Sequence, residues 1–377
     1  MKHLALIPLA LLASVLAGAQ NTPAFLARID SVINASMAAN KMPAISLGIV
    51  KDGHIFYLKG YGTKAVGEDS PVDSATNFLT CSVSKLFTAT AVMQLVEQGK
   101  IDIHKRLTDY LPDFYMKDER YKEITIEQML THTSGLPNIY NRHFIKPGAD
   151  SLELTLFARK LKSKRLSYPP GVQLSAHTYS NTAYNILGLV IERVTGQSYS
   201  DYVEQHVLKP VGMNYSSFRY RQIPESRRSR PHIKGALGKP VVSNYYPDIP
   251  QDKPCGNLNS CSYDLSLWML HNLGIYNNTD TGGVIKNTTL TTMWTTQKPI
   301  PTFSTSMGLG WWVVDSKKYG KYVFHDGNDP GYSAALVVSP GNNFGIVVLC
   351  NAMYPQEIVW NELPFRVIDL FEKEWKK

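Results

Sequence analysis

Ser82 and Lys85 are the pair of residues in this sequence best suited to nucleophilic chemistry. They stand three positions apart at the start of an almost wholly apolar segment, residues 82–98, which we expect to form a buried helix. Three residues make nearly one turn, so both side chains share a face, and burial lowers the pKa of a lysine toward the range in which it accepts a proton. The helix N-terminus adds partial positive charge and N–H groups for an oxyanion. We therefore expect Ser82 to be an acyl-transfer nucleophile and Lys85 its base.

A second candidate set, Tyr179-Ser180-Asn181, directly precedes an apolar segment expected to be a helix over residues 182–195. A tyrosine in such a loop can relay a proton between the nucleophile and the leaving group. The amide of Asn181 can hold a substrate carbonyl. Tyr179 is therefore predicted to be catalytic and Asn181 to bind substrate.

The third set, His325-Asp326-Gly327-Asn328, lies at the end of a predicted strand. Gly327 would let a substrate lie along that strand, and the N–H of Asn328 is a second oxyanion donor beside that of Ser82. His325, Gly327 and Asn328 are therefore predicted to contact the substrate. Neighbours on a strand point to opposite faces, so the side chains of His325 and Asp326 are not expected to pair.

Each set also has a simpler structural interpretation. Ser82 can cap its helix while Lys85 is a surface lysine, although the apolar helix offers no polar face for it. Tyr179 and Asn181 can be packing and N-cap residues, and a strand-end histidine such as His325 needs no catalytic role.

Strand patterns at both ends of the chain surround a helical middle, which predicts an α+β fold with one antiparallel sheet built from both termini and a mainly helical lobe inserted. We expect one catalytic domain over residues 20–377, with an α/β lobe at about 20–80 and 290–377 and a helical lobe at about 81–289. The strands are predicted at 45–50, 55–60, 310–314, 322–325, 334–338 and 344–349, and the helices at 82–98, 126–130, 152–161, 182–195, 199–207, 263–273 and 355–377. The segment 219–254 is a candidate substrate-facing loop.

The order and spacing of the three sets resemble the serine β-lactamase and penicillin-binding-protein superfamily, in particular its class C-like branch. That branch includes class C β-lactamases, D-alanyl-D-alanine carboxypeptidases, D-aminopeptidases and esterases. The resemblance covers roughly residues 33–351 and includes the stretches 124–137, 210–213 and 331–340. It implies that Ser82 is the nucleophile, Lys85 its base, Tyr179 the proton relay and Asn181 a substrate contact, and that His132 is structural.

The chain departs from the β-lactamase pattern in its third motif. True class C β-lactamases have Lys-Thr-Gly, whereas His325-Asp326-Gly327 is closer to the His-x-Gly of the peptidase relatives. Histidine has a reference pKa of about 6.5, so we expect the charge of His325, and any preference for a carboxylate-bearing substrate, to fall as the pH rises. Cys81 and Asp326 also replace smaller or more neutral residues. β-Lactam turnover is expected to be slow.

The N-terminus predicts export. Lys2, an apolar run over 4–16 and Ala17-Gly18-Ala19 match a signal peptide over residues 1–19, and the run is shorter than the roughly 20 residues that span a bilayer. With no later apolar run of that length, the mature chain is expected in the periplasm or secreted, without a transmembrane segment.

The net charge is +8, but the basic runs at 160–165 and 227–230 lack interleaved aromatics, so no nucleic-acid partner is expected.

The four cysteines show no paired Cys-x-x-Cys spacing, so neither a metal nor another cofactor is expected. In an oxidising compartment Cys255 and Cys261 could close a small disulfide loop, whereas Cys81 and Cys350 lie in apolar contexts and are expected to be buried thiols.

Together these features predict a metal-free serine hydrolase that cleaves an amide or ester bond through a Ser82 acyl-enzyme. The first choice is a D-amino-acid peptidase or carboxypeptidase. Its substrate is expected to be a small molecule or a peptide, and cell-wall peptide is a candidate. A β-lactamase and a small-ester hydrolase are the alternatives among enzymes. Outside enzymes, the alternative is a non-catalytic penicillin-binding sensor.

Overall fold

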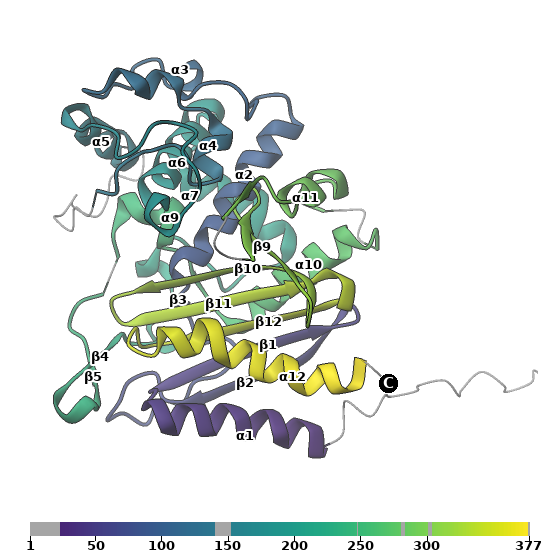
Figure 1. Ribbon diagram of the computed structural model, residues 1–377. Helices are drawn as coiled ribbons and strands as arrows, with labels where there is room; N and C mark the ends of the chain where they lie inside the picture. The colour runs from purple at the N-terminus through teal and green to yellow at the C-terminus, as the bar shows by residue number, and fades with distance from the viewer. Residues whose placement is uncertain (1–22, 140–151, 247, 280–282, 301–303, 376–377) are drawn as a thin grey trace, which may run out of the picture.

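Strands from both ends of the chain form one antiparallel sheet in the order β2-β1-β12-β11-β10-β9-β8-β7 (Figure 1). This computed structural model describes residues 23–139, 152–246, 248–279, 283–300 and 304–375. The predicted signal peptide, residues 1–19, lies outside these ranges. The N-terminal β1 pairs with the C-terminal β12, with Ser46 opposite Leu349. The predicted α+β fold class, with a sheet built from both termini, is confirmed.

The β1–β2 hairpin turns at Asp52 and Gly53, both of which have positive φ, the conformation that an Asp-Gly turn readily adopts. Two short pairs lie apart from the main sheet, β3 (Phe78–Leu79) with β6 (Asn259–Ser260) and β4 (His232–Lys234) with β5 (Pro240–Val242). The strands of the main sheet are β1 (Ala44–Lys51), β2 (His54–Gly62), β7 (Lys298–Pro299), β8 (Thr305–Met307), β9 (Trp312–Ser316), β10 (Gly320–Asp329), β11 (Tyr332–Ser339) and β12 (Phe344–Cys350).

Helices cover both faces of the sheet. On one face lie α1 (Pro23–Asn40) and α12 (Leu363–Trp375), which run side by side in Figure 1 and meet where the rings of Phe25 and Phe371 are 5.0 Å apart. On the other face α10 (Ser262–Tyr276) packs against β1 at Gly48, where any Cβ would collide with Ser266. Because both faces are covered, every residue of β1, β11 and β12 is buried.

The remaining helices lie mainly in the middle of the chain, and α2 runs through their centre with every residue from Ser84 to Leu95 buried. They are α2 (Ser84–Glu97), α3 (Leu107–Tyr110), α4 (Ile126–Leu130), α5 (Glu153–Lys160), α6 (Asn181–Thr195), α7 (Tyr199–Val203), α8 (Lys209–Val211), α9 (Lys253–Gly256) and α11 (Asn287–Met293). Within the described ranges, no helix is long and apolar enough to cross a membrane.

The observed helices differ from the predicted ones in several places, including these three. The helix expected over 82–98 begins with a 3₁₀ turn, Cys81–Val83, before α2 starts at Ser84. The helix expected over 199–207 divides into α7 and a π-helical turn at Glu204–Leu208. Helix α1 was not predicted, although Phe25, Ile29 and Ile33 recur every four residues and are all buried.

Candidate active site

Ser82 stands in a tight turn between β3 and α2. Cys81, just before it, has a φ of 51°, a left-handed conformation that a non-glycine residue adopts only where its surroundings enforce it. Here the Ser84 hydroxyl donates to the Cys81 carbonyl over 2.6 Å and accepts from the N–H of Leu258 over 3.0 Å. The turn that presents Ser82 is therefore fixed by a segment far away in the sequence.

Lys85 is completely buried next to Ser82. Its Nζ donates to Ser82 Oγ over 2.9 Å and to the carbonyl of Cys255 over 2.6 Å. Burial lowers the pKa of Lys85, and the negative charge of Asp252 is among the effects that oppose this. The surface-lysine interpretation is therefore wrong, and the geometry is that of a base next to a hydroxyl.

Tyr179 lies against Lys85 and Ser82. The Lys85 ammonium is 5.0 Å from the centre of its ring. Burial raises the pKa of Tyr179 well above its ordinary value, whereas a hydrogen bond with Ser82 acts in the opposite direction. Tyr179 is thus a neutral phenol at ordinary pH, able to donate a proton.

His132 and Asn138 hold the loop that carries Tyr179. Asn138 donates its amide to the carbonyl of Tyr179 over 2.8 Å and accepts the N–H of Asn181 over 2.7 Å. The ring of His132 packs against that of Tyr179 with the centroids 4.1 Å apart and the planes tilted by 31°, and its Nδ1 accepts the N–H of Ser180. His132 therefore contacts the loop as a structural residue would, whereas Asn138 was missed because no sequence pattern links it to a loop some 40 residues away.

Asn181 begins α6 and lines the cavity beside Ser82. Its side-chain oxygen is buried without a hydrogen-bond partner among the described residues. A buried carbonyl oxygen in this condition is costly unless a ligand satisfies it. Asn181 thus has a free acceptor where the sequence predicted a substrate contact.

The strand β10 passes so close to Ser82 that only glycine fits at position 327. A Cβ there would collide with the backbone nitrogen of Ser82 and come within 2.8 Å of the Cβ of Cys81. The next residue, Asn328, lines the same cavity as Ser82. The two predicted oxyanion donors therefore belong to neighbouring backbone segments.

His325 is buried, and its Nδ1 lies 2.7 Å from the carbonyl oxygen of Asp326. A carbonyl only accepts, so Nδ1 carries the proton, and the side chains of the two residues do not bond each other. Burial, followed by the charge of Lys85, lowers the pKa of His325 to about 3. The expectation that His325 changes charge across the working pH range is therefore wrong, because the sequence does not reveal its burial.

A neutral His325 should contribute nothing to the pH dependence of substrate selectivity. From pH 6 to 8, the ratio of kcat/KM for a carboxylate substrate to that for its amide analogue is expected to follow the same pH profile in wild type and in His325→Gln, because the histidine remains uncharged well above its folded pKa. Measuring the ratio in wild type and in His325→Gln checks this. A histidine-like drop in the wild-type ratio that is absent in His325→Gln would contradict it.

The cavity beside Ser82 has a volume of about 370 Å³. Tyr245, Ile249 and Asp252 of the segment 219–254, which was predicted to face the substrate, form part of its wall. Asp252 and Asp329 also line it and were not recognised in the sequence, where no motif marks them.

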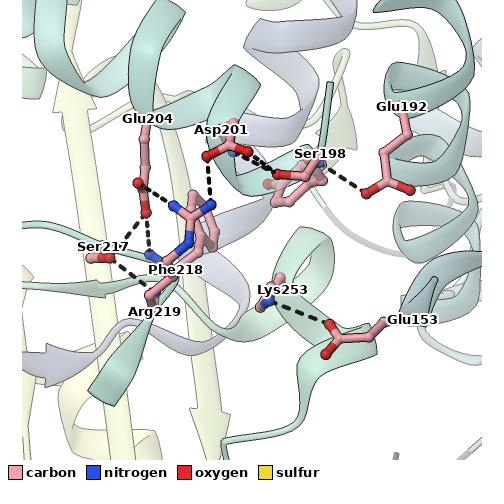
Figure 2. Close-up of polar contacts among 10 residues, drawn as sticks. Glu153, Glu192, Ser198, Asp201, Glu204, Ser217, Phe218, Arg219 and Lys253 are labelled. Atoms are coloured by element: carbon pink, nitrogen blue, oxygen red, sulfur yellow. Dashed lines mark hydrogen bonds and ion pairs between the residues drawn. The ribbon is translucent and has the colours of Figure 1, made fainter. Parts of the chain in front are cut away.

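Ion pairs hold both ends of that segment in place (Figure 2). At its start, Arg219 pairs with Glu204 and Asp201. At its end, Lys253 pairs with the buried Glu153 over 3.3 Å. Because Lys253 opens α9, this pair also supports the Cys255 carbonyl that receives Lys85.

All four cysteines are buried free thiols, so Cys255 and Cys261 form no disulfide in this structure, and the burial predicted for Cys81 and Cys350 is confirmed. Across the described ranges, no three His, Cys, Asp or Glu side chains come together as metal ligands.

Known proteins resemble the chain over most of its length. The profile of the Beta-lactamase family matches residues 29–364. Protein flp of Staphylococcus aureus is 28% identical over 86% of the chain, which spans 62% of that relative's length. The octameric penicillin-binding protein homologue from Pyrococcus abyssi has a TM-score of 0.77 and 26% identity, covering 92% of this chain and 77% of that one. A class C β-lactamase has a TM-score of 0.74 and 20% identity, covering 92% and 94%. The chain therefore belongs to the Beta-lactamase family.

Proposed function

We propose that this protein is a serine acyl-transfer hydrolase that cleaves an amide or ester bond through a Ser82 acyl-enzyme. The observation that carries the proposal is the 2.9 Å hydrogen bond between the Ser82 hydroxyl and the completely buried amine of Lys85. A lysine with a lowered pKa can act as a general base only when its amine lies within hydrogen-bond distance of the group it deprotonates. Lys85 lies at that distance from the Ser82 hydroxyl.

Acylation begins when neutral Lys85 takes the proton of Ser82 as Oγ attacks the substrate carbonyl carbon. The N–H groups of Ser82 and Asn328 hold the resulting oxyanion. When this intermediate collapses, the bond to the leaving oxygen or nitrogen breaks. That atom receives a proton from the Tyr179 phenol. The Lys85 ammonium then gives a proton back to Tyr179.

Deacylation repeats these steps with water in place of Ser82. Lys85 accepts a proton from the attacking water, and the ester bond to Ser82 Oγ breaks as that oxygen regains its proton. The acid product leaves, and the enzyme returns to its starting state.

Among substrates, D-amino-acid peptides remain our first choice, with cell-wall peptide as a source if the chain is exported. The His-x-Gly form of the third motif supports a peptidase-like site over a β-lactamase-like one. β-Lactams and small esters are the alternatives, because each presents a carbonyl to the same nucleophile.

A substrate panel tests the proposal. Purified protein is incubated with D-alanyl peptides, a chromogenic cephalosporin and a short-chain ester, alongside Ser82→Ala. We expect turnover of at least one class that Ser82→Ala lacks. Penicillin binding without turnover of any class would favour a sensor, and equal turnover by Ser82→Ala would remove the proposal.

Tyr179→Phe is expected to slow amide cleavage by about tenfold or more relative to cleavage of an activated ester, because a poor leaving group depends more on its proton. Rates for a p-nitroanilide and a p-nitrophenyl ester with the same acyl group measure this. Equal losses on both would mean that the phenol only packs against its neighbours.

A further inference from the structure

The cavity beside Ser82 has acidic walls. Asp252 and Asp329 line it, whereas its described lining contains no lysine, arginine or histidine. Lys85 lies behind Ser82, where it is bonded to the Ser82 hydroxyl and the Cys255 carbonyl. The chain as a whole has a net charge of +8, but the described lining of this cavity carries negative rather than positive side chains.

Asp252 is held in place by α6. Asn181 and Asn185 lie one turn apart on that helix, and Asn185 donates its amide to Oδ1 of Asp252 over 2.8 Å. Burial raises the pKa of Asp252 to about 6, so the carboxyl is mostly ionised at pH 7.5. Asp252 is half-buried, and among the described residues its carboxylate accepts a side-chain hydrogen bond from Asn185 alone, so a bound cation would offset the cost of its partial desolvation.

Asp329 lies near the end of α9, whereas Asp252 directly precedes its start. It directly follows Asn328 in β10, and its Oδ2 lies 3.5 Å from where a Cβ on Gly256 would be. The two carboxyls thus flank the short helix whose Cys255 carbonyl binds Lys85. Both act electrostatically on Lys85 and on Cys255, and both line the same cavity as Ser82.

We propose that this cavity selects acyl substrates that carry an ammonium group on the acyl part, which Asp252 binds, and that Asp329 disfavours a carboxylate near the scissile bond. The ammonium is assigned to the acyl part because Asp252 is bonded to Asn185, one turn along α6 from Asn181, whose amide is predicted to hold a substrate carbonyl. The inference rests on the proposed function and narrows it to D-aminoacyl amides or esters with a free amine, in place of substrates that end in a carboxylate.

Three p-nitroanilides that share one leaving group test this selectivity. D-alanine p-nitroanilide presents an ammonium, its N-acetyl derivative is neutral, and its N-succinyl derivative carries a carboxylate. At pH 7.5 we expect kcat/KM to fall in that order, with at least about tenfold between the ammonium and neutral substrates, the scale of one unit charge at close range. This ranking needs no variant, so it does not depend on any mutant folding.

Charge-removing variants assign the effect to residues. Asp252→Asn is expected to reduce the ammonium-to-neutral ratio by at least about tenfold, and Asp329→Asn to raise the relative rate of the succinyl substrate. Asp315→Asn, which removes a carboxylate from an exposed position on β9, is the matched control and should leave the ratios unchanged.

The outcomes separate this inference from the proposed function. Ser82-dependent hydrolysis without a preference for the ammonium substrate, or with a preference that survives in folded Asp252→Asn, would overturn the inference alone. Hydrolysis that persists in Ser82→Ala, or the absence of turnover both for all three anilides and for every class of the substrate panel, would overturn both.

Discussion

Lys85→Met is expected to reduce the rate of Ser82 acylation by at least about a hundredfold, the lower range for loss of a positioned general base. Methionine fills a similar volume but cannot take the Ser82 proton that Nζ now contacts. The fold should persist, because the change removes a completely buried amine whose desolvation is costly. Stopped-flow measurement of acyl-enzyme formation, with thermal unfolding beside it, gives both quantities.

Lys51→Met is the matched control for this experiment. Lys51 is a nearly buried lysine at the end of β1, where its Nζ bonds Asp52 and the carbonyl of Asn342. Its loss should leave acylation near the wild-type rate. Near-normal acylation by a folded Lys85→Met protein would show that Lys85 is structural and that another group is the base.

Gly327→Ala is expected to reduce kcat/KM by about a hundredfold, the cost of displacing reacting groups by about 1 Å. The new methyl group would collide with the Ser82 backbone nitrogen, so either β10 or the turn at Cys81 must move. Movement of either separates the two oxyanion donors, and transition-state stabilisation should suffer more than substrate binding. Separate measurement of kcat and KM distinguishes these effects.

Gly341→Ala provides the control for this substitution, because a Cβ at Gly341 has nothing within 4 Å and the residue lies outside the site. It should retain wild-type kinetics. Wild-type kcat/KM in Gly327→Ala would mean that the close approach of β10 to Ser82 does not matter for the reaction.

The sequence predicted those parts of the site that are local. Ser82 and Lys85 share one turn, and Tyr179 lies just before the helix that Asn181 begins, next to the start of the apolar pattern, so spacing alone was informative. The sheet followed from alternating, β-rich runs at both ends of the chain and from the Asp52-Gly53 turn.

The parts that were missed depend on contacts distant in sequence. The Cys255 carbonyl that binds Lys85 is 170 residues away from it, and no periodicity or motif connects them. Asp252 lines the cavity with its carboxylate bonded to Asn185 of α6, which lies 67 residues before it in the sequence. The lowered pKa of His325 results mainly from its burial by the surrounding structure, and the residues next to it in the sequence do not reveal that burial.

Mass spectrometry of the acylated protein tests the central claim most directly. The purified protein is treated with a serine-directed fluorophosphonate and with a penicillin, and each adduct is located by peptide mapping in wild type, Ser82→Ala and Lys85→Met. We expect one fluorophosphonate adduct per chain, on Ser82, absent from Ser82→Ala and formed far more slowly in Lys85→Met, with any penicillin adduct on the same serine. An adduct on a different residue, or labelling of Ser82→Ala at the wild-type rate, would contradict it.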